Sequence, residues 1–211
     1  AKLLAAVEKN RTMGGALLGR AAARALAIAE CNACMGKIVA APTAGSCGIV
    51  PGVLLTVQEA RGFSDDALID ALFTAAGIGM VIAKRASISG AEGGCQAECG
   101  TAAAMAAAAL VELGGGTPAQ AASACAFALM NSMGLVCDPV GGLVEIPCVF
   151  RNVMGAANAL TAADLALSGI PCLLPCDEVI DAMRRVGDAL PASLRETGEG
   201  GCASCSVCPL G

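Results

Sequence analysis

Histidine, tryptophan and tyrosine are absent from the 211 residues of this sequence. Without histidine, the chain alone cannot build a Ser-His-Asp or Cys-His catalytic group, an HExxH zinc site or any histidine-ligated metal centre. A histidine that takes part in a reaction must therefore come from another polypeptide. Four phenylalanines are the only aromatic residues. We therefore expect tightly packed helices of small residues rather than a core of large rings.

Charged residues are also scarce, at 15% of the chain against 56% hydrophobic residues, and the net charge is -5. This acidic balance argues against nucleic acid as a partner, because phosphate binding needs a basic surface. The longest uncharged stretch, residues 113–137, contains four glycines, one proline, six alanines and two serines. A membrane span needs about 20 strongly apolar residues, so we expect a buried helix and no membrane span. The first residue is alanine, which fits a part of a longer chain.

Cysteine is abundant, with thirteen residues. The number is odd, no signal peptide precedes them, and many lie among alanines in helix-like runs. These features favour a reducing, cytoplasmic location over a disulfide framework. Most of the thiols are expected to be buried and free, because cysteine packs as a small hydrophobic residue. Metal ligation is the alternative for a subset.

The apolar pattern predicts an all-α fold, a compact single-domain bundle of alanine-rich helices. Ser64 is a good N-cap, and Thr117 followed by Pro118 is a typical helix start. Runs such as residues 37–40, "KIVA", are too few to make a sheet. We expect a catalytic-type domain over residues 1–200, a cysteine-rich tail over 201–211, and a site built from three loops at 41–48, 86–95 and 135–148. The predicted helices span 14–35, 49–60, 65–85, 100–113, 118–133, 149–167 and 177–190.

Two sets of cysteines compete as metal ligands. Cys202, Cys205 and Cys208 have the C-x2-C-x2-C spacing that begins a ferredoxin-type cluster motif, although the fourth cysteine is missing. Spacing alone favours this set, and the alternative is a flexible tail without metal. The second set is Cys95, Cys137 and Cys148, each in a loop or at the end of a helix. No spacing rule selects these three.

Four segments carry a family resemblance: "GKIVAAPTAGSCGIVPGVLL", "KRASISGAEGGCQAECG", "LVCDPVGGLVEIPCVFRN" and "LRETGEGG". In this order they closely resemble the α chain of iron–sulfur-dependent bacterial L-serine dehydratases, lyases that convert L-serine to pyruvate and ammonia without pyridoxal phosphate. The resemblance implies a cytoplasmic enzyme of amino-acid catabolism and gluconeogenesis, with an all-helical domain. It also implies a 4Fe-4S cluster on Cys95, Cys137 and Cys148 with one iron left open for substrate. The cysteine-rich tail departs from the family pattern.

The same resemblance gives the glycine-rich loop "PTAGSCG" a role in binding L-serine, through backbone N–H groups and hydroxyls at the start of a helix. A plain helix–helix turn is the alternative. Lys84 is the candidate base and Ser46 a second catalytic candidate, while Lys37 is a candidate for the substrate carboxylate. Glu92 and Asp138, beside cluster cysteines, are candidates for supporting groups. The expected substrate-binding residues are Thr43, Ala44, Gly45, Ser46, Ser87 and Ser89.

Three other functions stay open at this point. A pyridoxal-phosphate dehydratase would use Lys37 and the "GGGTP" loop, but it would need alternating strands and helices. A cysteine desulfidase would share the cluster and differ in the leaving group. A non-enzymatic iron–sulfur or metal-binding module would use the Cys202, Cys205 and Cys208 tail. The resemblance further implies a β subunit or β domain and homo-oligomerisation.

Overall fold

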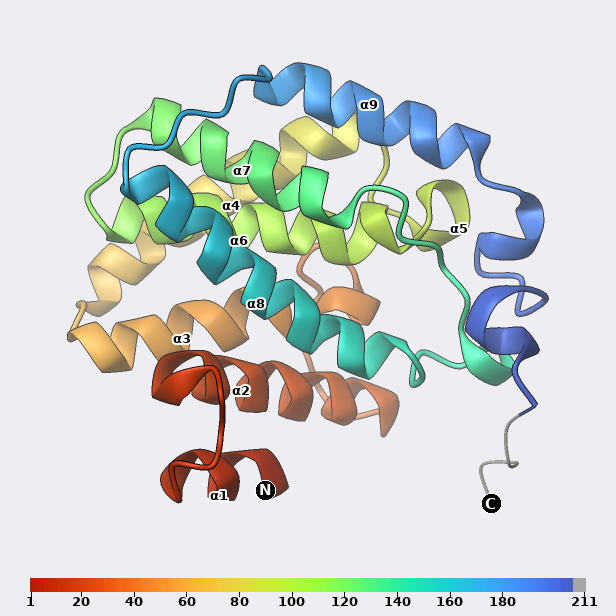
Figure 1. Cartoon of the computed structure of the whole chain (residues 1–211), viewed down its shortest axis with the longest axis horizontal. Coiled ribbons are helices and arrows are strands. Elements are labelled where there is room, and N and C mark those ends of the chain that lie inside the picture. The colour runs from red at the N-terminus through yellow and green to blue at the C-terminus, as the bar shows by residue number, and fades with distance from the viewer. Residues whose placement is uncertain (207–211) are drawn as a thin grey trace.

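The computed structural model describes residues 1–206 as a bundle of α-helices (Figure 1). No β-strand forms within these residues, where a single parallel bridge joins Cys137 to Arg195. The predicted all-α fold is confirmed. The helices are α1 (Lys2–Glu8), α2 (Gly15–Ala33), α3 (Ile49–Arg61), α4 (Asp65–Arg85), α5 (Gly90–Gly93), α6 (Thr101–Leu113), α7 (Pro118–Ser132), α8 (Cys148–Leu167) and α9 (Cys176–Ala189).

Helix α6 is the centre of the bundle (Figure 1). Every residue of α6 except Glu112 is buried, and α3, α4, α7 and α8 all pack against it. The sequence of α6, "TAAAMAAAALVEL", explains this position. Alanine side chains are short, and the distance between packed helices is set by the side chains at the contact. Four neighbours can therefore surround a helix that is apolar on every face.

The predicted helix starts are confirmed at two positions. The backbone N–H of Ala67 donates to the Ser64 hydroxyl at 3.2 Å, and Asp65 and Asp66 follow in the first turn of α4. Thr117 and Gln120 form a reciprocal capping box ahead of Pro118. The start of α6 differs from the prediction, because a π-helical turn over Gln96–Gly100 precedes it. The predicted break at 86–95 contains the single-turn helix α5.

Helix α4 has more exposed large hydrophobic residues than any other helix within residues 1–206. It is long and apolar enough to span a membrane by length and composition alone, which for one helix is weak evidence. Only 22% of its most apolar window is buried in this chain. The inner face packs against α6. The outer face therefore presents hydrophobic side chains that nothing within residues 1–206 covers.

Substitution by alanine at two helical glycines should change the stability of the protein in opposite directions. A Cβ added at Gly52 of α3 would lie 2.9 Å from the backbone nitrogen of Ala25 in α2, whereas one added at Gly77 of α4 meets nothing within 4 Å. Gly52→Ala should therefore lower the free energy of unfolding by about 1–3 kcal/mol through overpacking. Gly77→Ala should raise it by about 0.5–1 kcal/mol through helix propensity. Urea unfolding measures both, and a Gly52→Ala midpoint at or above that of the wild type would contradict the close packing of α2 and α3.

Candidate functional site

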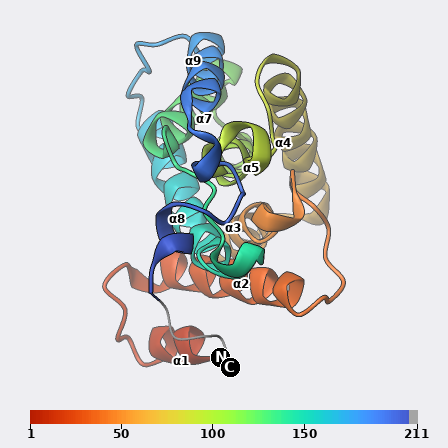
Figure 2. The same ribbon diagram turned by 90° about the vertical axis from the view of Figure 1, so that its right-hand side faces the viewer.

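Three loops and the C-terminal segment meet at one end of the bundle, which faces the viewer in Figure 2. Successive helices run back and forth, so the connections alternate between the two ends. The α2–α3, α4–α6 and α7–α8 connections lie at the same end (Figure 1). These connections contain the three loops predicted at 41–48, 86–95 and 135–148. The topology therefore gathers the glycine- and cysteine-bearing loops of this chain.

The first loop is fixed by a buried asparagine of α8. Asn152 is fully buried, accepts a hydrogen bond from the backbone N–H of Gly48 at 2.9 Å and donates one to the Gly45 carbonyl at 2.7 Å. Within the loop, the hydroxyls of Thr43 and Ser46 lie 3.1 Å apart. Ser46 is itself buried and donates to the Ala41 carbonyl at 3.4 Å. Asn152 was not among the residues predicted from the sequence.

The three cysteines of the dispersed set are buried at this end of the bundle. Cys95, Cys137 and Cys148 are 2%, 3% and 7% exposed. Cys95 precedes the π-helical turn, and Cys148 is the first residue of α8. Cys137 donates its backbone N–H to Leu194 and accepts one from Glu196, so the C-terminal segment pairs with its loop.

The three thiols also interact electrostatically. Burial, together with the neighbouring charges of Cys95 and Glu98, raises the pKa of Cys148 to about 12. Burial likewise raises the pKa of Cys137, with contributions from Glu98, Cys95 and Cys148. A hydrogen bond from the Cys99 thiol lowers the pKa of Cys95. The charge of Cys95 therefore raises the pKa of both Cys137 and Cys148, which places the three thiols in a common environment.

Arg151 joins the three cysteine-bearing segments. It lies on α8, three residues after Cys148, and donates to the Val136 carbonyl at 2.8 Å. Its guanidinium pairs with Asp138 at 2.7 Å, and both side chains are largely buried. It also hydrogen-bonds the Cys95 thiol. This single cation therefore lies beside all three segments, where it lowers the pKa of both Cys95 and Cys148.

A carboxylate that the sequence did not single out lies among the same loops. Glu98 is on the π-helical turn and is half-buried. Burial raises its pKa, and a hydrogen bond with Thr43 opposes that shift. π-helical turns often occur at functional sites because they redirect a side chain from the regular helix. That geometry, unlike the residue type, leaves no clear signal in the sequence.

Lys84 and Ser87 line a separate cavity of about 490 Å³ on the α9 side of the second loop. Glu92, Arg184 and Arg195 line the same cavity, and none of the three dispersed cysteines does. The Ser87 hydroxyl donates to the Glu92 carboxylate at 2.5 Å and accepts from the Ser89 backbone N–H at 3.0 Å. The structure therefore separates Lys84 and Ser87 from the group formed by Thr43, Ala44, Gly45 and Ser46.

The tail cysteines lie close to the same end of the bundle. The backbone N–H of Cys202 donates to Asp138 at 2.6 Å, Cys205 is exposed, and Cys208 lies outside the described residues. Within residues 1–206, no three histidine, cysteine or acidic side chains are close enough to hold a single metal ion. Ligand sulfurs around one ion lie about 4 Å apart, given metal–sulfur bonds of about 2.3 Å. A four-iron cluster separates its cysteine ligands further, so this finding bears on a single ion only.

Comparison with known proteins identifies the family of this chain. Residues 1–203 match the family described as "Serine dehydratase alpha chain". The chain is 56% identical over 203 residues to the probable L-serine dehydratase alpha chain of Bacillus subtilis, covering 96% of this chain and 68% of that protein. It is 53% identical over 194 residues to the L-serine dehydratase alpha chain of Peptoniphilus asaccharolyticus, covering 92% of this chain and 66% of that protein.

A longer relative is also similar. The chain is 45% identical over 186 residues to the L-serine dehydratase TdcG of Escherichia coli, covering 87% of this chain and 41% of that protein. This chain therefore spans about two thirds of the B. subtilis and P. asaccharolyticus alpha chains and less than half of the E. coli protein.

The Arg151–Asp138 pair should be required for the stability of this end of the bundle. Arg151→Met leaves Asp138 buried without its cation, which should lower the free energy of unfolding by about 3 kcal/mol. The double variant Arg151→Met/Asp138→Asn removes both charges and should recover part of that loss. Chemical unfolding of the two variants and of Asp138→Asn alone completes the cycle. Strictly additive losses would show that the two side chains do not interact.

Proposed function

Because the chain belongs to the serine dehydratase alpha chain family, we propose that it forms the α part of an L-serine dehydratase, which converts L-serine to pyruvate and ammonia. The observation that carries the proposal is the meeting of three buried cysteines with the glycine-rich loop at one end of the bundle. The reaction removes the α-proton and the hydroxyl of serine. The resulting aminoacrylate then hydrolyses to pyruvate and ammonia.

Cys95, Cys137 and Cys148 are the proposed ligands of a 4Fe-4S cluster. Thiolates are the usual protein ligands of such clusters, and these three are buried on loops that a single arginine joins. Arg151 supplies positive charge beside thiolates that burial alone would keep protonated. When bound, the cluster supplies an iron atom with an open coordination position, which serves as a Lewis acid toward the hydroxyl of serine. A reducing cytoplasm suits free thiols of this kind.

The glycine-rich loop is the proposed binding surface for the rest of the substrate. Thr43 and Ser46 present hydroxyl groups next to Ala44 and Gly45, and Asn152 holds the loop in place. Of the two serines predicted on the neighbouring loop, Ser89 is kept in the proposed set, whereas Ser87 lines the separate cavity with Lys84. Ser46 is proposed to act through its buried hydroxyl. The candidates for proton acceptor are Lys84, which lines the adjacent cavity, and a histidine of the β part.

A β subunit or β domain is the proposed partner. The E. coli relative is more than twice as long as the region that matches this chain. We take its remaining part as the equivalent of the proposed β partner, which covers this chain. The outer face of α4 is the proposed contact, because large exposed apolar patches mark interfaces. A small apolar groove beside it, lined in part by Val39 and Leu55, extends the patch. The exposed large hydrophobic residues of α4 are Ile69, Leu72, Phe73, Met80 and Val81.

Single cysteine variants test the cluster. Cys95→Ser, Cys137→Ser and Cys148→Ser should each lose most of the iron and sulfide that the wild-type chain retains after anaerobic reconstitution, because each removes a thiolate ligand. Iron and sulfide analysis measures the loss, and circular dichroism checks that the helices remain. Cys34→Ser, at an exposed position, is the matched control. Loss of iron from Cys202→Ser/Cys205→Ser, with the three single variants unaffected, would contradict the assignment.

Introducing charged residues on the outer face of α4 tests whether this face contacts the β part. Phe73→Glu/Met80→Glu should abolish co-purification with the β chain and serine turnover by the mixture, because burying two carboxylates in an apolar interface is strongly unfavourable. Leu173→Glu, at a residue that is 90% exposed outside the patch, should bind normally. Gel filtration of the mixed chains measures the complex. A complex that forms at wild-type strength with the double variant would place the β contact elsewhere.

A further inference from the structure

The carboxylate of Glu98 lies against two glycines from different loops. A Cβ added at Gly45 would lie 3.3 Å from its Oε2 and 3.4 Å from its Oε1. A Cβ added at Gly90 would lie 3.0 Å from the same Oε2 and 2.8 Å from the sulfur of Cys137. Glycine at both positions therefore lets the carboxylate approach the two loops more closely than a side chain would allow. The carboxylate borders both the glycine-rich loop and one of the proposed cluster ligands.

The surroundings of Glu98 are short of positive charge. Among residues 1–206, no lysine or arginine forms a salt bridge with it, whereas Arg151 is paired with Asp138. Within residues 1–206, the hydroxyl of Thr43 is close enough to the carboxylate to oppose the rise in its pKa that burial causes. The charges of Cys95, Cys137 and Cys148 all interact with it. A half-buried carboxylate in an anionic environment is costly unless a cation joins it.

L-serine carries such a cation on its α-amino group. The Glu98 carboxylate lies between the loop proposed to hold the substrate and the sulfur of Cys137. We propose that Glu98 is a substrate-binding residue that pairs with the ammonium group of L-serine and so selects amino acids over hydroxy acids. This inference rests on the proposed function and deepens it.

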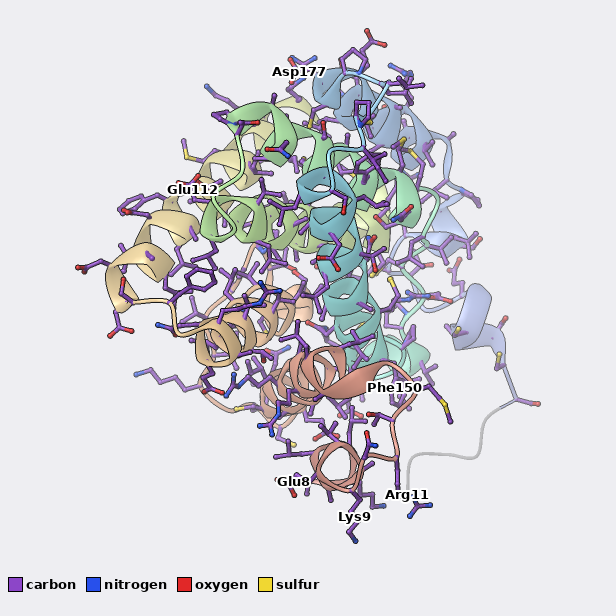
Figure 3. The ribbon with its side chains drawn as sticks, turned by 60° about the vertical axis from the view of Figure 1, so that its left-hand side comes forward. Glu8, Lys9, Arg11, Glu112, Phe150 and Asp177 are labelled. Atoms are coloured by element: carbon purple, nitrogen blue, oxygen red, sulfur yellow. The ribbon has the colours of Figure 1, made fainter. Side chains whose placement is uncertain are left out.

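The test uses the complex of this chain with its β chain, reconstituted anaerobically. Pyruvate formation gives kcat and KM for L-serine, and L-glycerate, which has a hydroxyl in place of the ammonium, serves as a competitive inhibitor. Glu98→Gln keeps the shape of the side chain and removes its charge. Glu112→Gln is the matched control, since Glu112 is exposed at the opposite end of the same continuous helical stretch (Figure 3).

In Glu98→Gln the KM for L-serine should rise about tenfold or more, the scale of a lost hydrogen bond to a charged group. The inhibition constant of L-glycerate should change by less than about threefold or improve, because glycerate gains nothing from the negative charge. Glu98→Asp keeps the charge and should retain most of the preference for serine over glycerate. Iron content should match the wild type in all three variants. Glu112→Gln should leave both constants unchanged.

Two results would overturn the inference. Equal weakening of L-serine and L-glycerate in Glu98→Gln would show a general structural effect without recognition of the ammonium. Loss of iron from Glu98→Gln would assign the carboxylate to the cluster. A wild-type complex that does not act on L-serine would instead contradict the proposed function, so the two failures are distinguishable.

Discussion

Close packing around α6 is the constraint on which the rest of the structure depends. A helix buried along all but one of its residues can have four neighbours only if its side chains are small. The alanines of α6 meet that condition, and glycines such as Gly52 and Gly155 bring the surrounding helices into similarly close contact. The helices then run back and forth at short range, and their connections collect at two ends. One of these ends holds every loop that bears a proposed ligand.

Charge is distributed unevenly at that end. Arg151 lies beside the cysteines and is paired with Asp138, which in turn accepts a hydrogen bond from the backbone N–H of Cys202. Glu98 also lies near the cysteines and forms no salt bridge among the described residues. The two side chains therefore suit different purposes. Arg151 balances the charge of thiolates that stay in place, and Glu98 offers an anionic position to a cation that enters and leaves.

The features that the sequence predicted correctly are those that depend on local patterns of residues. Ser64 and Thr117 were identified as helix caps from the residues that follow them, and both are confirmed. Asn152 and Glu98 were not identified as site residues. Asn152 holds Gly45 and Gly48, which precede it by more than one hundred residues. Glu98 points among the loops because of a π-helical turn, and neither a long-range contact nor that turn has a recognisable spacing in one sequence. The family resemblance selected Cys95, Cys137 and Cys148, which periodicity and spacing left unresolved.

The most direct measurement of the central claim is an anomalous difference map at the iron absorption edge, from crystals of the chain reconstituted anaerobically. The account predicts one compact peak bounded by the sulfurs of Cys95, Cys137 and Cys148, next to the glycine-rich loop. A peak bounded instead by the tail cysteines, or a reconstituted chain without iron at this end of the bundle, would contradict it.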